Sequence, residues 1–345
     1  MNKTIGFIGG KFLPLHFGHI FAILEAHKQV DKLYIILSSS ENRDIKLCKQ
    51  DGIKYMPADI RMSWLGETFN NIENIEIINI KDDQWDNNYD WAKGAKMIIK
   101  AIPEKITHIF SSEHSYTELF KKLYPSTKHI VLDSERKIIP ISATEIRLNL
   151  FSNWEKLPNN VKAFFVKKVL ITGTESVGKS ILTTKLSKFF NTNFVHEIGK
   201  DYCERFKNHL TVSMFDSIAM EHYLLQEKLM PYSNKVMFID SDAVITQYYL
   251  NMYTSKTSSL IDEIIKRQTF DLCLYLEPDV EWVSDGFRFK GNPDERNKNN
   301  KILKDMYTHQ ISKIPTTCIQ GDYSNRFTVA TQKVRNLLTN NKRKK

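Results

Sequence analysis

The 345-residue chain is too long for one ordinary hydrophobic core, which predicts two domains of roughly 150 to 190 residues. Its composition, 41% hydrophobic and 26% charged, is typical of a soluble globular protein and contains no apolar run long enough to cross a bilayer. The 49 basic residues exceed the 40 acidic ones and give a net charge of +9 at pH 7, which is compatible with nucleic acid, an anionic membrane or anionic small substrates.

The N-terminus leads directly into a strand-like run, without the succession of segments that marks a secretory signal, so we expect a cytoplasmic protein without membrane insertion. The four cysteines are scattered, which predicts reduced and mostly structural thiols. The basic run at 340–345 is interpreted as a solvated tail. The sequence leaves open whether the protein forms a homo-oligomer.

Short apolar runs alternate with amphipathic segments along the whole chain, which predicts βαβ units on parallel sheets. The first series has strand-like runs at 4–9, 32–38, 75–80, 107–111 and 129–133. The second has them at 166–173, 193–197, 236–240, 271–277 and 316–321. The periodicity breaks at Pro158, Asn159 and Asn160. We therefore predict two doubly wound α/β domains, 1–160 and 161–345.

Two histidines, His16 and His19, flank Gly18 in the segment PLHFGHI, where the first strand passes to a helix. A zinc pair, a catalytic pair and an accidental cluster are all conceivable. Zinc needs further ligands at metal-site spacing, and none lies nearby in the sequence. Anion binding fits better, because Gly9 and Lys11 end the strand and the helix N-terminus offers free N–H groups. Imidazoles there would donate hydrogen bonds to an α-phosphate and its leaving group.

A second segment, PISATEIR, closes the same predicted domain with Ser142, Thr144 and Arg147. Its hydroxyl groups open a helix, and the arginine follows nearly one turn later. Alone, the pattern would be interpreted as a capping box. Together with the histidine segment, it predicts that two donor-rich helix starts hold a triphosphate between them.

The second domain contains GTESVGKS, Gly173 to Ser180, between a strand and a helix, as a phosphate-binding loop requires. Backbone N–H groups around Gly173 and Gly178 would surround phosphate oxygens, Lys179 would reach the β and γ phosphates, and Ser180 would bind Mg²⁺. Asp240 ends a buried strand where a magnesium ligand is needed.

Three further features surround this loop. Asp242 follows Asp240 and is either a site carboxylate or an exposed strand-end residue. Glu197 ends another strand and is a candidate base or hydroxyl-orienting group, with helix capping as the alternative. The stretch 282–296 resembles a mobile lid or a plain surface loop. Its candidate site residues are Trp282, Asp285, Arg288 and Arg296.

The two motif sets together resemble the NadR family of bifunctional nicotinamide mononucleotide (NMN) adenylyltransferases and ribosylnicotinamide kinases. The likeness lies in G-x-F-x-P-x-H-x-G-H with a later I-S-x-T-x-x-R, in SSSENRD, and in ITGTESVGKS, VHE, FIDSD, WVSDGFR and GDYSNRF. It covers essentially the whole chain. The aminoacyl-tRNA synthetase signature K-M-S-K-S, which accompanies the same histidine motif elsewhere, is absent.

The resemblance implies ATP, nicotinamide riboside, NMN and NAD as ligands, with Mg²⁺ as cofactor. For the transferase it implies catalysis by His16 and His19. It implies ATP binding by these two and by Gly9, Lys11, Phe12, Ser142, Thr144 and Arg147. It implies NMN binding by Asp83, Tyr89 and Trp91, with Trp85 as a further candidate for stacking the ring.

For the kinase the resemblance implies catalysis by Lys179, Glu197 and Asp240, with metal binding by Ser180 and Asp240. It implies ATP binding by Gly173, Gly178, Lys179, Ser180, Arg288 and Arg296. It implies nicotinamide riboside binding by Glu197, Asp240, Asp242, Trp282 and Asp285.

Two competing functions remain at this point. A bifunctional coenzyme A synthase also joins such a transferase to a phosphate-loop kinase, although the residues around Glu197, Asp240 and Trp282 argue against it. A nucleotide-sensing regulator would bind ATP and NAD with little turnover. Some members of the family carry an N-terminal helix-turn-helix module, whereas this sequence begins at the catalytic strand, so we expect no specific nucleic-acid partner.

Overall fold

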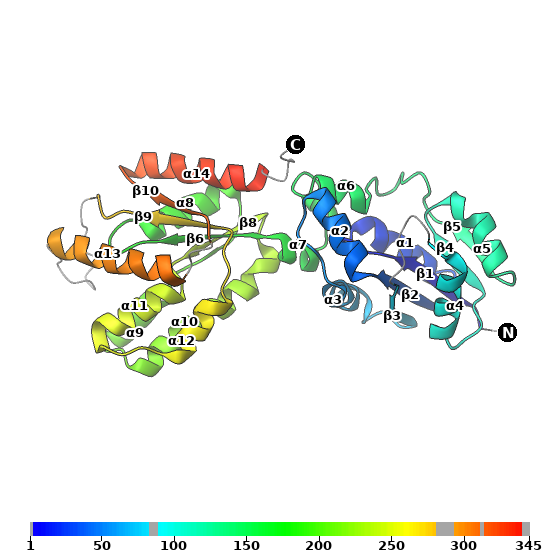
Figure 1. The fold of residues 1–345 in the computed structure, drawn as a ribbon, viewed down its shortest axis with the longest axis horizontal. Helices are drawn as coiled ribbons and strands as arrows, with labels where there is room; N and C mark the ends of the chain where they lie inside the picture. Colours follow the sequence, from blue (N-terminus) through cyan, green and yellow to red (C-terminus); the bar gives the residue numbers. More distant parts are fainter. Residues whose placement is uncertain (1–2, 83–88, 281–292, 311–313, 340–345) are drawn as a thin grey trace. The chain divides into compact units, whose positions relative to one another are not determined.

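The computed structural model describes residues 3–82, 89–280, 293–310 and 314–339 (Figure 1). These residues form two compact units that divide between Phe164 and Phe165. None of the helices in these ranges is long and apolar enough to cross a membrane. Each unit is described by itself.

Unit 1 is built on a parallel five-stranded sheet in the order β3-β2-β1-β4-β5. Its strands are β1 (Ile5–Gly10), β2 (Lys32–Ser39), β3 (Ile75–Lys81), β4 (His108–Ser111) and β5 (Lys128–Val131). Its helices are α1 (Phe17–His27), α2 (Glu41–Asp51), α3 (Ala58–Phe69), α4 (Trp91–Ala101), α5 (Thr117–Leu123), α6 (Ala143–Leu148) and α7 (Asn159–Phe165), with short turns η2 (His114–Tyr116) and η3 (Trp154–Lys156). The strand order reverses at β1, and ligands bind beyond the carboxyl ends of the strands at such a point.

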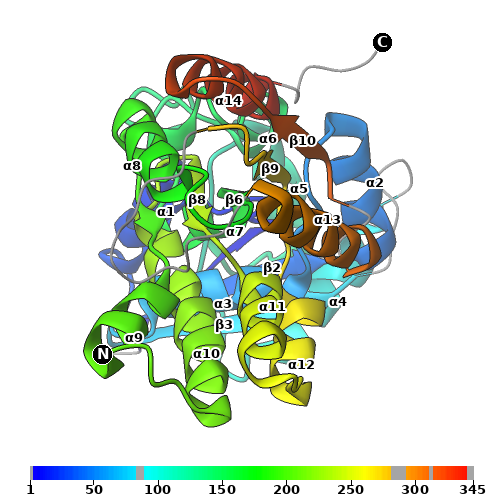
Figure 2. The same cartoon turned by 90° about the vertical axis from the view of Figure 1, so that its left-hand side faces the viewer.

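Unit 2 has a second parallel five-stranded sheet, in the order β10-β9-β6-β8-β7. Its strands are β6 (Lys167–Thr172), β7 (Phe194–Val195), β8 (Val236–Asp240), β9 (Leu272–Leu276) and β10 (Thr316–Ile319). Its helices are α8 (Lys179–Phe190), α9 (Ile198–Phe206), α10 (Val212–Leu229), α11 (Ala243–Thr254), α12 (Ser259–Arg267), α13 (Pro293–Gln310) and α14 (Tyr323–Thr339), with η4 (Met230–Tyr232). Helices α9 to α12 pack as one group, and α8 packs against α14 (Figures 1 and 2).

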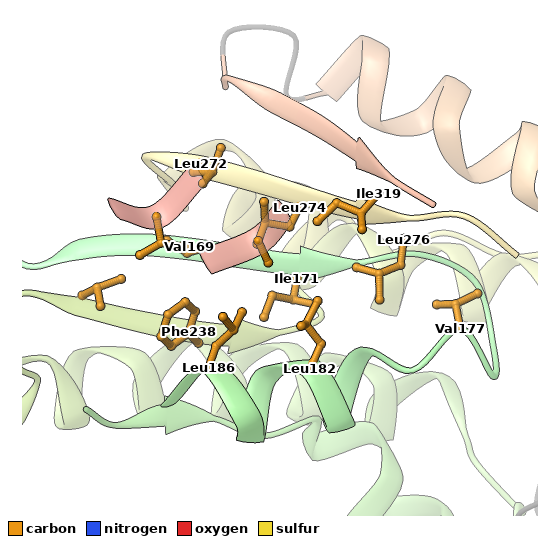
Figure 3. Packing of buried hydrophobic residues seen from close by; sticks show 13 residues of the cluster. Val169, Ile171, Val177, Leu182, Leu186, Phe238, Leu272, Leu274, Leu276 and Ile319 are labelled. Carbon is orange, nitrogen blue, oxygen red and sulfur yellow. The ribbon is translucent and has the colours of Figure 1, made fainter. Parts of the chain in front are cut away.

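The core of unit 2 explains the apolar runs in its strands. Ile171 in β6, Phe238 in β8 and Leu274 in β9 are fully buried and belong to one hydrophobic cluster with Leu182 and Leu186 of α8 (Figure 3). A strand in the middle of a parallel sheet is covered on both faces, so its sequence is continuously hydrophobic. The same strands carry the phosphate loop and Asp240 at their carboxyl ends, and the core therefore fixes the positions of both.

Candidate active sites

The histidine pair lies at the start of α1, directly after the loop that follows β1. His16 is the N-cap residue, and its Nδ1 accepts a hydrogen bond from the main-chain N–H of His19 at 3.3 Å. The two imidazole rings are stacked with centroids 3.7 Å apart, and Phe12 lies edge-on to His19. A Cβ on Gly18 would come within 3.0 Å of the His16 ring. The glycine between the histidines thus makes room for an imidazole.

Both imidazoles are held neutral. Burial, with a smaller effect of Arg136, lowers the pKa of His16 to about 3. Burial, the neighbouring His16 and Arg136 hold the pKa of His19 well below its usual range. Since Nδ1 of His16 accepts a hydrogen bond, Nε2 of that ring carries the proton. Neither His16 Nε2 nor His19 Nδ1 has a hydrogen-bond partner within the described structure. The pair therefore presents neutral, unsatisfied polar atoms that suit a phosphate oxygen.

A buried ion-pair network lies behind this loop. Arg61 is 1% exposed, donates to the carbonyl of Lys11 at 2.7 Å and pairs with Asp44 at 2.6 Å. Arg43 donates to the other oxygen of Asp44 at 3.1 Å. Because breaking such a buried network is costly, it fixes the backbone of the loop. Through Arg43 and Asp44, the segment SSSENRD thus holds Arg61 against the backbone of the histidine loop. Its sequence does not reveal this role.

The segment PISATEIR lies beside the histidine loop. The hydroxyl oxygen of Ser142 caps α6 by accepting a hydrogen bond from the main-chain N–H of Glu145. Arg147 donates to Asp51 at 2.7 Å, to the carbonyl of Leu13 at 2.8 Å and to the hydroxyl of Thr144 at 3.0 Å. All three nitrogens of its guanidinium group are thus engaged, and the residue fastens the loop before His16. Its predicted contact with ATP remains a prediction.

Aromatic side chains gather where β3 and β4 pass into the following helices. Trp91 is 38% exposed, and its ring lies 4.8 Å from Tyr89 and 5.3 Å from Tyr116 between centroids. An exposed aromatic surface of this kind can stack a flat heterocycle. Tyr116, the last residue of the short turn η2, was not among the predicted site residues. The predicted residues Asp83 and Trp85 lie outside the described residues.

The phosphate loop of unit 2 joins β6 to α8. Gly173 and Gly178 have φ angles of 143° and 86°, in the region that favours glycine. A Cβ would meet the carbonyl of Leu276 at 2.5 Å in the first case and the ring of Tyr323 at 2.7 Å in the second. Lys179 is 5% exposed and donates to the carbonyl of Thr174 at 3.0 Å. The lysine thus lies against the loop that would hold the phosphates.

Asp240 lies at the end of β8 and is only 2% exposed. Burial and the charge of Glu197 raise the pKa of Asp240 to about 6, whereas Lys179 and a hydrogen bond with Ser180 lower it. The Oε2 atom of Glu197 is buried and has no partner within the described residues. Two close carboxylates and a hydroxyl suit Mg²⁺, which binds one or two carboxylates together with phosphates and waters. The donors present therefore fit the metal.

Asp242 has a task that the sequence did not predict. It caps α11, and its carboxylate accepts hydrogen bonds from Tyr307 of α13 at 2.5 Å and from Gln268 at 2.8 Å. Burial raises the pKa of Asp242 to about 6. Both oxygens are thus used to join elements of the fold, although the residue also lines a cavity of unit 2.

This cavity has a volume of about 580 Å³ and lies among α9, α10 and α11. Glu197, Phe215, His222 and Tyr249 line it, and His222 Nε2 is buried without a partner in the described part of the chain. The volume and the mixed lining suit a nucleoside-sized molecule. His222 was not predicted from the sequence, because a single histidine within a helix gives no signal.

The predicted lid residues are only partly placed. Trp282, Asp285 and Arg288 lie outside the described residues. Arg296 belongs to α13 and donates to the carbonyl of Val280 at 3.2 Å, while its Nε and Nη2 have no partner among the described residues. Its predicted role in ATP binding remains a prediction.

A further residue holds the phosphate loop in place. Arg326 is 1% exposed and donates to the carbonyls of Val177 at 2.6 Å, Glu277 at 2.8 Å and Gly321 at 2.7 Å. It thereby joins the loop, the end of β9 and the turn before α14. The sequence of the segment GDYSNRF does not reveal this role of Arg326.

Comparisons with known proteins agree with both halves. Residues 7–149 match the model of the cytidylyltransferase-like family, and residues 168–326 match that of an AAA domain. The chain is 33% identical to the trifunctional NAD biosynthesis/regulator protein NadR of Escherichia coli (strain K12) over 98% of this chain and 84% of the relative. The corresponding protein of Salmonella typhimurium is 32% identical, with the same coverage.

The fold has a close counterpart among solved structures. A NadR protein crystallised in complex with NR superimposes with a TM-score of 0.79 over 98% of this chain and 97% of that one, at 24% identity. A NadR protein in complex with NAD and AMP-PNP gives the same TM-score over 98% and 96%, at 22% identity. With this fold and the identity to the two bacterial relatives over nearly its whole length, the chain belongs to the NadR family.

Proposed function

We propose that the protein makes NAD in two steps. Unit 2 phosphorylates nicotinamide riboside with ATP to give NMN, and unit 1 joins NMN to the AMP part of a second ATP to give NAD and pyrophosphate. The observation that carries this proposal is the presence, in one chain, of a complete phosphate loop beside buried carboxylates and of a neutral histidine pair with unsatisfied nitrogens. The named activity of the bacterial relatives supports it.

In the kinase step the 5′-oxygen of the riboside forms a bond to the γ-phosphorus of ATP, and the bond to the bridging β–γ oxygen breaks to release ADP. Lys179 holds the β and γ phosphates. Glu197 lies in the cavity wall with one oxygen unpartnered, so it can orient the hydroxyl and accept its proton. Ser180 and Asp240 would hold Mg²⁺, which neutralises charge on the phosphates when bound.

In the transferase step a phosphate oxygen of NMN forms a bond to the α-phosphorus of ATP, and pyrophosphate leaves with the electrons of the broken bond. The His16 Nε2–H donor stabilises charge that grows on the α-phosphate and the leaving group. Trp91, with Tyr89 and Tyr116, stacks the nicotinamide ring. No covalent intermediate is needed.

The proposal is tested by incubating the protein with MgATP and, separately, nicotinamide riboside, NMN or phosphopantetheine, followed by mass analysis of the products. We expect NMN and NAD from the riboside, NAD and pyrophosphate from NMN, and no change in phosphopantetheine. Adenylylation of phosphopantetheine would favour a coenzyme A pathway enzyme. Unchanged NMN would contradict the proposal, and binding of ATP and NAD without turnover would indicate a sensing protein.

The two reactions should depend differently on pH. Asp240 has a pKa raised to about 6, so it is ionised above that pH and takes up a proton as the pH falls through it. We expect kcat/KM of riboside phosphorylation to fall on acidification with an apparent pKa near 6, because a protonated carboxyl cannot serve as the metal ligand. The pKa of His16 is about 3, so its imidazole stays neutral between about pH 5 and 8.

Effects of ATP ionisation are kept apart by measuring kcat/KM for the riboside at saturating MgATP, since the riboside itself has no group that titrates between about pH 5 and 8. The inflection near pH 6 should remain under this condition. A kcat/KM that is constant between about pH 5 and 8 would show that Asp240 does not titrate in the kinase step.

A further inference from the structure

The transferase site needs positive charge beside the phosphate chain of ATP, and the two motif histidines do not provide it. The phosphate chain of ATP is multiply charged, and catalysis of its cleavage requires cations near the leaving group. Both histidines are neutral. The motif arginine, Arg147, pairs with Asp51 and also donates to the carbonyl of Leu13 and the hydroxyl of Thr144, so three of its five N–H donors are used within the fold.

Arg136 lies in the loop between β5 and α6, and this loop has a defined conformation. The carboxylate of Asp133 accepts hydrogen bonds from the main-chain N–H groups of Lys137 at 2.9 Å and Ile138 at 3.2 Å. The main-chain N–H of Arg136 donates to the carbonyl of Asp133 at 2.8 Å. Arg136 has a φ angle of 51°, so it sits at a sharp reversal of the chain. The turn fixes the point from which the side chain extends.

The same loop packs on the start of α1. Ile138 and Ile139 line an apolar groove together with Phe17 and Ile20 of that helix. Ile141, at the end of this loop, lies beside Gly18, the residue between the two histidines. Its Cγ2 atom would be 3.4 Å from a Cβ on Gly18. The loop that carries Arg136 is therefore anchored to the helix turn that carries His16 and His19.

The guanidinium group of Arg136 acts on both histidines. Its charge contributes to the lowered pKa of His16 and to that of His19. The side chain is exposed, and within the described structure no hydrogen bond or ion pair holds its guanidinium group. The structure thus combines an exposed guanidinium group, whose charge reaches both imidazoles, with His16 Nε2 and His19 Nδ1 atoms that are buried without partners among the described residues. One polyanionic ligand could satisfy all three groups.

We propose that Arg136 is a further catalytic residue of the transferase, which binds the phosphate chain of ATP and stabilises the departing pyrophosphate, while Arg147 holds the loop before His16. This inference rests on adenylyl transfer as the function of unit 1. It adds a second arginine to the one that the sequence motif contains.

The test compares Arg136→Ala with Lys137→Ala. Lys137 is the matched control because its side chain is 76% exposed, lies in the same loop and pairs with Glu135 at 2.5 Å. We expect Arg136→Ala to lower kcat/KM for ATP in NAD formation about 10- to 100-fold, as for one lost hydrogen bond to a charged group. Inhibition by pyrophosphate should weaken by a similar factor, the KM for NMN should change less than about twofold, and Arg136→Lys should restore part of the activity.

Lys137→Ala should remain within about twofold of the wild type, and phosphorylation of the riboside should be unchanged in both variants. Thermal unfolding reports whether either variant is misfolded. If Arg136→Ala differs from Lys137→Ala by less than about twofold in both kcat/KM for ATP and inhibition by pyrophosphate, the proposal is wrong.

A binding measurement tests the role of Arg136 independently of whether unit 1 catalyses adenylyl transfer. Calorimetry with inorganic pyrophosphate is carried out on full-length protein with Lys179→Ala, which removes the lysine of the other phosphate site. If the wild type made no NAD, adenylyl transfer would be refuted. Weaker binding of pyrophosphate after Arg136→Ala would even then support a contact between Arg136 and the phosphate chain. If the affinity for pyrophosphate is the same with arginine and with alanine at position 136, the proposal for Arg136 is wrong.

Discussion

Replacing Lys179 with alanine is expected to abolish phosphorylation of nicotinamide riboside and to leave NAD formation from NMN at the wild-type rate. The Lys179 side chain is buried beside the phosphate loop, and its Nζ donates to the carbonyl of Thr174. In the transition state this ammonium group faces charge on the transferring phosphate. Loss of one such donor lowers kcat about 100- to 1,000-fold. Separate assays with the riboside and with NMN measure the two effects.

The same substitution should also change the pH profile of whatever kinase activity remains. Lys179 lowers the pKa of Asp240, so its removal raises that pKa and moves the inflection of kcat/KM to higher pH. Lys185 provides the control, since it is an exposed lysine on the same helix, α8. Lys185→Ala should behave as the wild type. An equal loss of both reactions in Lys179→Ala, with unchanged thermal unfolding, would contradict two separate sites.

The fold could be predicted from the sequence because its signals are local. Alternating strand and helix periods predicted two doubly wound α/β domains, and the two parallel sheets with the matching family models confirm this class. The phosphate loop was recognisable for the same reason. Gly173 and Gly178 occupy backbone conformations that other residues rarely adopt, so the requirement is visible in the residue type itself.

Roles that depend on distant partners could not be predicted. Asp242 accepts a hydrogen bond from Tyr307, which lies 65 residues further along the chain. Arg326 donates to the carbonyl of Val177, 149 residues away. A motif records which residue types occur together, whereas it does not record which of their atoms are already hydrogen-bonded. The sequence of the motif therefore gave no sign that Arg147 uses three of its N–H groups to hold Asp51, Leu13 and Thr144.

Replacing His19 with alanine is expected to abolish NAD formation, while phosphorylation of the riboside continues and NMN accumulates. The substitution removes a ring that stacks on His16 at 3.7 Å and a buried nitrogen that suits a phosphate oxygen. The loss should be about 100- to 1,000-fold in kcat, as for a donor to developing charge. His27→Ala is the control, since His27 lies at the far end of α1 and its Nε2 contacts the carbonyl of Glu73.

A second variant, His19→Asn, tests whether the neutral imidazole or the imidazolium form of His19 is active in NAD formation. Because burial and nearby charge hold the pKa of His19 well below its usual range, the ring can act only as a neutral hydrogen-bonding group at pH 7. His19→Asn places a neutral amide near the position of Nδ1, so it should retain more activity than His19→Ala at every pH between about 5 and 8. If the asparagine variant were as inactive as the alanine variant, and the wild-type rate rose with protonation near pH 6.5, the active species would be the imidazolium. The neutral pair described by the structure would then be the wrong state for catalysis.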